Sequence, residues 1–226
     1  MSEIKAVIFD FDGVIFSTPK ISYPIWKKIF DGLGIEFSEE IYRKKFQGAR
    51  TSEKVPRILK EHSKYSEELV EKILEDRENV KREVLNDIEN KDFEDMIIPG
   101  SIDFLKQVKD GGLKMTLVTS SVKETAMVPI KRLGIEDFFD VLLFAGDVKK
   151  GKPDPEAFLL AAKKMGVEPK SCIVFEDAVN GLKAAKNAGM RVVAVNSSNN
   201  YEDLKRENPE RIINNFENIN LGDFIE

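Results

Sequence analysis

Five short apolar runs, separated by stretches of helical character, constrain the fold of this chain more than any other feature. The runs are Ala6–Phe9, Met115–Val118, Val141–Phe144, Cys172–Phe175 and Val192–Val195. Nearly every residue in them is apolar, as expected of strands that are covered on both faces. Helical stretches end at Gly134, Gly166 and Gly189, and Asp154 with Pro155 is suited to start another. This alternation predicts an α/β fold with a doubly wound parallel sheet.

The stretch between the first two runs interrupts this alternation, because it contains helical patterns and no convincing strand. Ile21, Ile25 and Ile29 fall at i, i+4 and i+8, on one face of a helix. Further helical patterns cover Glu39–Phe46, Thr51–His62 and Glu67–Asn90. We therefore expect an α/β core formed by residues 1–16 and 97–226, and an inserted all-helical domain formed by residues 17–96.

Charge and cysteine content exclude several classes of protein. The net charge of −5 argues against non-specific nucleic-acid binding, which requires a basic face. Cys172 is the only cysteine, so an intramolecular disulfide is impossible. The apolar runs are far shorter than the roughly 18 residues of a membrane span, and no signal peptide opens the chain. We expect a soluble, cytoplasmic monomer that binds neither nucleic acid nor membranes, with its only histidine, His62, solvated on a helix.

Polar side chains follow four of the apolar runs, where the corresponding strands would end. In the order of the runs they are Asp10 and Asp12, then Thr119, Ser120 and Ser121, then Lys152, and finally Glu176 and Asp177. In an open parallel sheet, ligands bind beyond the carboxyl ends of the strands, near the switch point. We therefore expect these side chains to face a single site.

The residue types at this site together favour phosphoryl transfer. Clustered carboxylates repel one another unless a cation is present, and a hard divalent ion such as Mg2+ suits the three aspartates beside a phosphate. The hydroxyl groups and the lysine are donors for phosphate oxygens, and Gly13 lets backbone amides approach an anion closely. Each residue alone has an ordinary explanation, such as a helix cap or a surface lysine. Their coincidence at four strand ends favours a carboxylate nucleophile, a metal and donors for the phosphoryl oxygens.

Four motifs carry a resemblance to the haloacid dehalogenase superfamily of phosphohydrolases. They are DFDGV at 10–14, LVTSS at 117–121, GKPDP at 151–155 and FEDAVNG at 175–181. The motifs occur in the family's order, and the resemblance covers essentially the whole chain. It implies a Rossmann-like core, and the helical insertion is similar to the cap domain of the β-phosphoglucomutase and phosphoglycolate phosphatase branch.

The resemblance also implies a role for each matched residue. Asp10 would be the nucleophile that forms an aspartyl-phosphate. Asp12 would be the general acid for the leaving group and then the base that activates water. Thr119 and Lys152 would hold the transferring phosphoryl group, and Lys152 would also shield its negative charge.

By the same resemblance, Mg2+ would be bound by Asp10, by Asp177 and by the backbone carbonyl of Asp12. Glu176 would join this set directly or through water. The expected function is Mg2+-dependent hydrolysis of a small phosphorylated metabolite. Arg50 lies in FQGAR, where this branch has a substrate-specificity loop. It either reaches a second anionic group of the substrate or is a surface arginine.

Two other functions remain open at this point. A phosphosugar mutase of the β-phosphoglucomutase type is similar in its cap pattern, including Trp26. However, Ser22 stands where a mutase carries a cap histidine, and Ser17 stands where the first motif usually has a further aspartate. A non-enzymatic phospho-acceptor, as in receiver domains, also combines acids after a first strand with a later lysine. It has no use for the helical insertion, and Asp12 favours turnover because it can deprotonate water.

Overall fold

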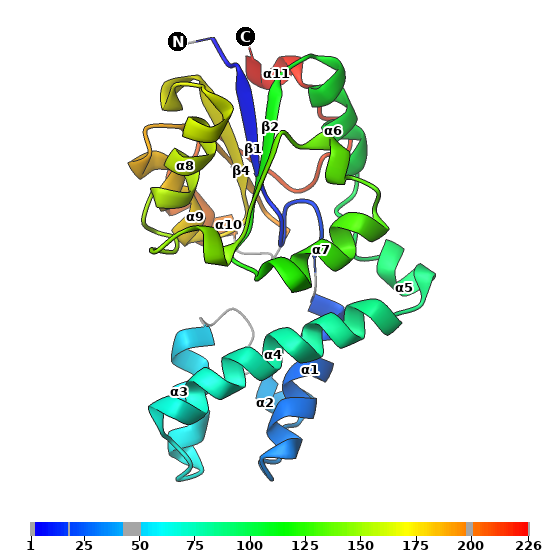
Figure 1. Ribbon diagram of the computed structural model, residues 1–226, viewed down its shortest axis with the longest axis vertical. Helices are drawn as coiled ribbons and strands as arrows, with labels where there is room; N and C mark the ends of the chain where they lie inside the picture. The colour runs from blue at the N-terminus through cyan, green and yellow to red at the C-terminus, as the bar shows by residue number, and fades with distance from the viewer. Residues whose placement is uncertain (1–2, 18, 43–50, 198–200, 226) are drawn as a thin grey trace. The chain divides into compact units, whose positions relative to one another are not determined.

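The computed structural model describes residues 3–17, 19–42, 51–197 and 201–225. The chain divides into two compact units, Met1–Ser17 with Asn90–Glu226 and Thr18–Glu89. We call the first the α/β unit and the second the helical unit (Figure 1). Helix α5 (Asn90–Glu94), which we expected in the helical domain, belongs to the α/β unit. There the ring of Phe93 packs against that of Phe16, with centroids 4.9 Å apart.

The described part of the α/β unit forms a six-stranded, fully parallel sheet in the order β3-β2-β1-β4-β5-β6. The strands are β1 (Ala6–Asp10), β2 (Lys114–Val118), β3 (Val141–Leu143), β4 (Cys172–Glu176), β5 (Arg191–Val195) and β6 (Arg211–Ile213). The order reverses at β1, which lies between β2 and β4 in the middle of the sheet. Asp10 pairs with Val118, and Phe9 pairs with Phe175. The residues that follow these pairs therefore meet at one edge of the sheet.

The five predicted strands are confirmed to within two residues at each end, whereas β6 was not predicted. Apolar runs are reliable signals for strands that are buried throughout, as β1 is. Strand β6 has three residues, lies at the edge of the sheet and begins with the exposed Arg211. A segment this short lacks the run of about four to eight apolar residues that identifies a buried strand.

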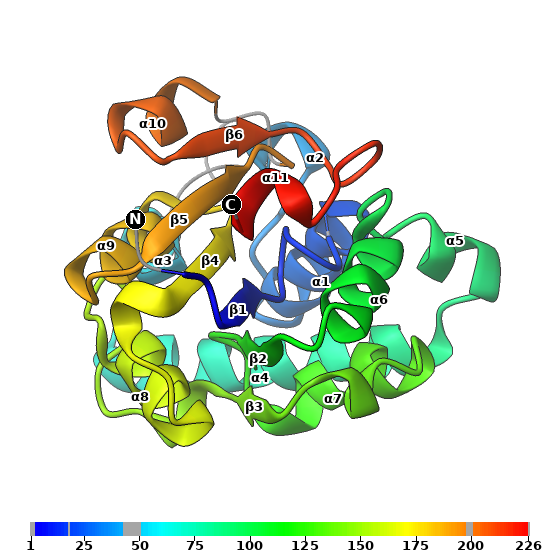
Figure 2. The ribbon, with the colours of Figure 1, turned by 90° about the horizontal axis from the view of Figure 1, so that it is seen from above.

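Helices cover both faces of the sheet (Figure 2). They are α6 (Ser101–Asp110), α7 (Lys123–Arg132), α8 (Glu156–Met165), α9 (Val179–Asn187), α10 (Tyr201–Arg206) and α11 (Gly222–Ile225), with short 3-10 helices η2 (Glu136–Phe138), η3 (Ala145–Asp147) and η4 (Pro169–Ser171). Ile8 and Val174 pack on one face against α8 and α9. On the other face Phe9 stacks on Phe175 at 5.3 Å, and Phe104 of α6 meets Phe175 edge-on at 5.2 Å. Alternate residues of β1 and β4 thus supply two cores.

The helical unit contains α1 (Pro19–Gly32), α2 (Glu39–Ile41), α3 (Thr51–Glu61) and α4 (Glu67–Asp87). The expected apolar face of α1 is confirmed, with Ile25, Trp26 and Phe30 buried. The helix expected over Glu39–Phe46 is described only as α2, because residues 43–50, including Arg50, lie outside the described residues. The helix expected to reach Asn90 ends at Asp87, where Ile88 turns to an extended conformation.

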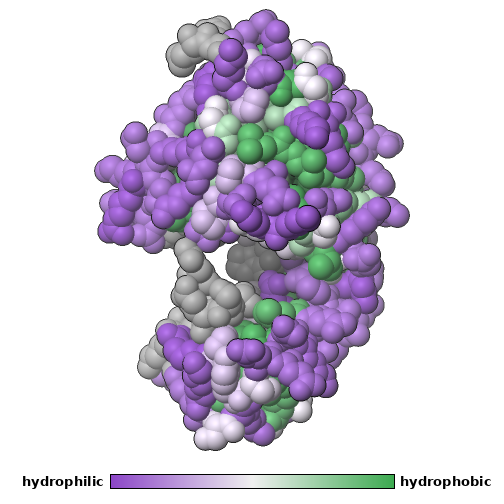
Figure 3. Space-filling model, turned by 60° about the vertical axis from the view of Figure 1, so that its left-hand side comes forward, coloured by the Kyte–Doolittle hydropathy of each residue, from purple (hydrophilic) through white to green (hydrophobic). Residues whose placement is uncertain are grey.

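The surface of each unit is mainly hydrophilic on the face shown in Figure 3. His62 is exposed, as expected, and Cys172 is fully buried in β4. Within the described ranges, no helix combines the length and the apolar character needed to cross a membrane.

Candidate active site

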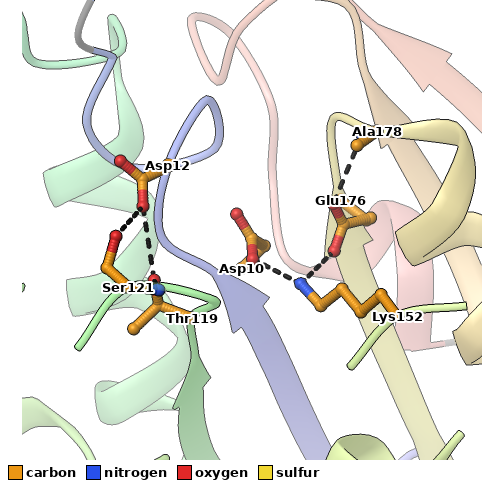
Figure 4. A network of polar contacts seen from close by, with 7 residues as sticks. All are labelled: Asp10, Asp12, Thr119, Ser121, Lys152, Glu176 and Ala178. Atoms are coloured by element: carbon orange, nitrogen blue, oxygen red, sulfur yellow. Dashed lines mark hydrogen bonds and ion pairs between the residues drawn. The ribbon is translucent and has the colours of Figure 1, made fainter. Parts of the chain in front are cut away.

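The candidate site lies at the carboxyl ends of β1, β2 and β4 and includes Lys152 from the connection between β3 and α8 (Figure 4). Strand β1 ends at Asp10, and the chain then turns back on itself. The backbone N–H groups of Ile15 and Phe16 both donate to the carbonyl of Phe11, at 3.0 and 3.1 Å. This tight loop keeps the next carboxylate, that of Asp12, beside the end of β2.

Lys152 joins the carboxylates that end β1 and β4. Its Nζ atom lies 2.5 Å from Asp10 Oδ1 and 2.7 Å from Glu176 Oε2. The three side chains are 10%, 8% and 2% exposed, respectively, so this ion pair is largely shielded from water. Burial lowers the pKa of Lys152, but the charges of Asp10 and Glu176 outweigh that effect, so its pKa lies above its ordinary value. Lys152 therefore stays an ammonium group throughout the physiological pH range.

Asp10 is in an unfavourable place for a negative charge. Burial raises its pKa well above the ordinary value, and the neighbouring charge of Glu176 raises it further. The ammonium group of Lys152 acts in the opposite direction, and the smaller contributions of Asp177 and Asp12 raise the pKa again. A further positive charge close to Asp10 would favour its ionised form.

Asp12 has partners different from those of Asp10. Its Oδ2 atom accepts hydrogen bonds from the hydroxyl groups of Thr119, at 3.3 Å, and Ser121, at 3.1 Å. The backbone N–H of Ser121 donates in turn to Thr119 Oγ1 at 3.0 Å. Figure 4 shows these two hydroxyl groups reaching Asp12 from the end of β2, on the side of Asp10 opposite to Lys152.

The sequence placed Thr119, Ser120 and Ser121 together after the second strand, but we assigned roles in the site only to Thr119 and Ser120. Ser121 is buried and contacts Asp12, whereas Ser120 is exposed. The chain bends after β2, where the Ser121 N–H donates to Thr119 Oγ1, and this bend brings both hydroxyl groups to Asp12, whereas Ser120 lines the neighbouring cavity.

Two glycines make room for the acids that follow β4. Gly13 has φ +84°, and a Cβ atom there would overlap Asp177 Oδ2. A Cβ atom on Gly181 would overlap the carboxyl group of Glu176. The N–H of Gly13 itself donates to the carbonyl of Phe16 at 2.8 Å, and the approach of other backbone amides to an anion at this glycine stays a prediction. In this structure the glycine provides space for Asp177.

The acidic residues fit a hard divalent cation. Asp10, Glu176 and Asp177 each offer a carboxylate oxygen, and these atoms lie within 4.8 Å of one another. Oxygen-only donor sets rich in carboxylate are those that Mg2+ prefers in proteins. The Asp12 carboxylate is not part of this described cluster. Glu176 already accepts hydrogen bonds on both oxygens, from Lys152 and from the Ala178 N–H at 3.2 Å.

A cavity of about 190 Å³ opens beside the site. Its polar lining includes Thr119, Ser120 and Lys152, and its apolar lining includes Leu143 and Phe144. The donors expected to bind phosphate oxygens therefore border a space that can admit a small group.

Comparison with known proteins agrees with this geometry. Residues 4–189 match the family model of haloacid dehalogenase-like hydrolases. A phosphorylated carbohydrates phosphatase of Thermotoga maritima is 32% identical over 221 residues, covering 93% of this chain and 97% of the relative. A β-phosphoglucomutase of Bacillus subtilis is 32% identical over 203 residues, covering 85% and 83%. The crystal structure of a β-phosphoglucomutase from Clostridium difficile superposes with a TM-score of 0.75 at 32% identity, covering 97% and 94%. The chain belongs to the haloacid dehalogenase-like hydrolases.

Proposed function

We propose that this hydrolase is a Mg2+-dependent phosphatase of small phosphorylated carbohydrates, acting through an aspartyl-phosphate on Asp10. The observation that carries the proposal is the division of partners between two carboxylates. Asp10 is bound by an ammonium group, which favours the ionised form that a nucleophile needs, and Asp12 is bound by neutral hydroxyl groups, which can either donate or accept as Asp12 loses or gains a proton. The similarity to a phosphatase that is named for phosphorylated carbohydrates supports the substrate class.

In the first step, an Asp10 oxygen attacks phosphorus and the bond from phosphorus to the sugar oxygen breaks. Asp12 donates its proton to that leaving oxygen, so the sugar departs as a neutral alcohol. In the second step, Asp12 takes a proton from water, the resulting hydroxide attacks phosphorus, and the bond to Asp10 breaks. Inorganic phosphate leaves, and both side chains return to their starting protonation states.

Lys152, Thr119 and Ser120 would stabilise the transferring group. The ammonium group of Lys152 lies beside the attacking carboxylate and borders the cavity, so it can neutralise charge on the phosphoryl oxygens. Ser120 offers a hydroxyl donor on the same lining, and the Thr119 hydroxyl, which donates to Asp12 in this structure, would turn to donate to the phosphoryl group. Asp10 Oδ1 faces Lys152, and the other Asp10 oxygen points away from it (Figure 4).

Asp10 and Asp177, with the backbone carbonyl of Asp12, would hold the metal ion. A bound Mg2+ supplies positive charge that offsets the repulsion between the acids and the phosphoryl oxygens. Glu176 would contribute through water, because both of its oxygens are engaged by Lys152 and the Ala178 N–H. The role of the helical unit as a substrate-selecting cap, and the contact of Arg50 with a second anionic group, stay predictions.

The second candidate is a phosphosugar mutase, favoured by the similarity to two β-phosphoglucomutases. A mutase must return the phosphoryl group from the aspartate to the sugar before water attacks the aspartyl-phosphate. In the β-phosphoglucomutase branch, a cap histidine takes part in this cycle. The serine at position 22 argues against this activity.

Phosphate release from a panel of sugar phosphates with Mg2+, followed together with sugar-phosphate isomerisation, tests the proposal. We expect release without isomerisation, loss of release on chelation by EDTA, and loss in Asp10→Asn. The control is Asp140→Asn. The carboxylate of Asp140 accepts a hydrogen bond from the Met115 N–H at 2.7 Å, at the end of the sheet opposite to the site. Isomerisation without release would establish the mutase, and undiminished release by Asp10→Asn would refute the proposed nucleophile.

A further inference from the structure

Glu156, the first residue of α8, binds the loop that carries Lys152. The backbone N–H of Lys149 donates to Glu156 Oε1 at 2.9 Å, and that of Lys150 donates to Glu156 Oε2 at 3.0 Å. Each carboxylate oxygen thus holds one of two consecutive amides. The side chains of Lys149 and Lys150 are exposed, so the loop is attached here through its backbone.

The residues between these amides and α8 form a closed turn. The N–H of Asp154 donates to the carbonyl of Gly151, and the N–H of Glu156 donates to Asp154 Oδ1, both at 3.1 Å. We expected α8 to begin with Asp154 as its cap; the helix begins at Glu156, and the Asp154 carboxylate still caps its first N–H. The path of the backbone on both sides of Lys152 is therefore fixed by hydrogen bonds.

Helix α8 is a firm anchor for this turn. Its next two residues, Ala157 and Phe158, are buried, and both belong to the core formed with β1, β2 and β4. The Lys152 Nζ atom lies 5.2 Å from the centroid of the Phe158 ring. The same helix therefore fixes the loop through Glu156 and supports the lysine side chain through Phe158.

We propose that Glu156 is a positioning residue that sets the place of the Lys152 ammonium group against Asp10. Its carboxylate joins the loop amides to the start of α8, and Lys152 follows two residues after the second amide. The effect on catalysis rests on the proposed phosphatase function, whereas the contact itself does not. Sequence reasoning missed Glu156, because an acidic residue in the first turn of a helix has an ordinary explanation in the helix dipole.

The variants Glu156→Gln and Glu156→Asp test the proposal. Glutamine keeps one acceptor oxygen and presents an NH2 donor to the other amide, so one hydrogen bond is lost. Aspartate keeps the negative charge at the start of α8 but is too short to bind both amides. Asp140→Asn is the matched control, because it removes a carboxylate that accepts from the backbone N–H of Met115, far from the site.

Three measurements apply to each variant: hydrogen exchange at the Lys149 and Lys150 amides, kinetics with 4-nitrophenyl phosphate and Mg2+, and a crystal structure. We expect faster exchange at one amide or both, because neither variant can hold the two amides together, and displacement of the Lys152 Nζ atom from Asp10. We also expect kcat to fall roughly tenfold or more with little change in KM, because misplacing a reacting group by about 1 Å is costly. The control should keep wild-type exchange at these amides and wild-type kcat.

Wild-type exchange at the two amides, or an undisturbed Lys152 in the variant structures, would overturn the proposal. A wild-type kcat in a variant with faster exchange would also overturn the proposal. Full activity of Glu156→Asp would overturn it as well, because the role of Glu156 would then be limited to its charge at the start of α8. A wild-type enzyme that releases no phosphate from any substrate refutes the proposed function instead. The exchange and the position of Lys152 then still decide the role of Glu156.

Discussion

Asp10 and Asp12 are two residues apart in the sequence, yet one carboxylate is bound by an ammonium group and the other by two hydroxyl groups. The loop between Phe11 and Phe16 makes this separation possible, because it turns the chain directly after β1. The two acids can therefore be tested one at a time.

Asp12→Asn should separate the two chemical steps. Asparagine keeps the shape of the side chain but cannot carry a proton, so hydrolysis of the phosphorylated enzyme should slow by a factor of about 100 or more. The first step should survive with 4-nitrophenyl phosphate, whose leaving group needs no proton. The measurement is a burst of nitrophenol close to one equivalent per enzyme, followed by slow turnover. Steady release at the wild-type rate would contradict a proton role for Asp12.

Ser121→Ala should lower activity, although the sequence alone gave this serine no role beyond its place after the second strand. The change removes a hydrogen bond to a carboxylate, which is worth about 1.5–3 kcal/mol, so kcat should fall roughly tenfold or more. Ser171→Ala is a control for loss of a buried serine hydroxyl, since Ser171 is also buried but precedes β4 at the other end of the sheet. Equal kcat values for the two variants would show that the hydrogen bond from Ser121 to Asp12 does not contribute to catalysis.

Gly13→Ala should raise the Mg2+ concentration that gives half-maximal activity. The added Cβ atom would overlap Asp177 Oδ2, so this carboxylate would have to move. Gly112→Ala is the matched control, because Gly112 also has a positive φ, +69°, but its Cβ atom would meet nothing within 4 Å. The control should lose about 1 kcal/mol of stability without a change in Mg2+ dependence. If both variants needed more Mg2+ for half-maximal activity, the effect would be due to backbone strain and not to the displacement of Asp177.

Cys172 should be unreactive in the folded protein. Burial raises the pKa of its thiol to about 11, so at pH 8 it remains protonated and inaccessible. A disulfide reagent should label it only after unfolding in urea. Fast stoichiometric labelling of the native protein at pH 8 would contradict the buried placement.

The same thiol should make a small part of the stability depend on pH. Its folded-state pKa lies above the ordinary value of 9.0, so its contribution is complete below that pH and is lost as the pH rises toward about 11. The difference in unfolding free energy between the wild type and Cys172→Ala should therefore narrow across this range. A constant difference would show that the thiol does not titrate as expected.

Burial on both faces explains why most of the sheet can be predicted from the sequence. A strand such as β1 is apolar throughout, and the polar residues that follow each such strand are brought to one edge by the parallel arrangement. Lys152, Asp10 and Glu176 meet for this reason. Strand β6 has no comparable pattern, and α5 lies in the α/β unit because of a distant contact between Phe93 and Phe16.

The supporting contacts of the site could not be predicted in the same way. The bond from Ser121 to Asp12 depends on which way a hydroxyl points after β2, and the bonds from Glu156 depend on the path of an irregular loop. No residue type in the sequence is specific for the direction of a hydroxyl group or for the path of an irregular loop.

The position of β1 in the sheet has a consequence for synthesis of the protein. This strand is made before both of its partners, because β2 begins at Lys114 and β4 begins at Cys172. Until β2 is made, the nascent chain carries an apolar strand with two unpaired edges, and one of these edges stays unpaired until β4 is made. Such edges are a template for aggregation. The helical unit, made of neighbouring segments, is complete by Glu89 and can fold while β1 still waits for its partners. Asp10, at the end of β1, is thus made well before the strands on both sides of it, and both edges of β1 can be paired only after β4 has been synthesised.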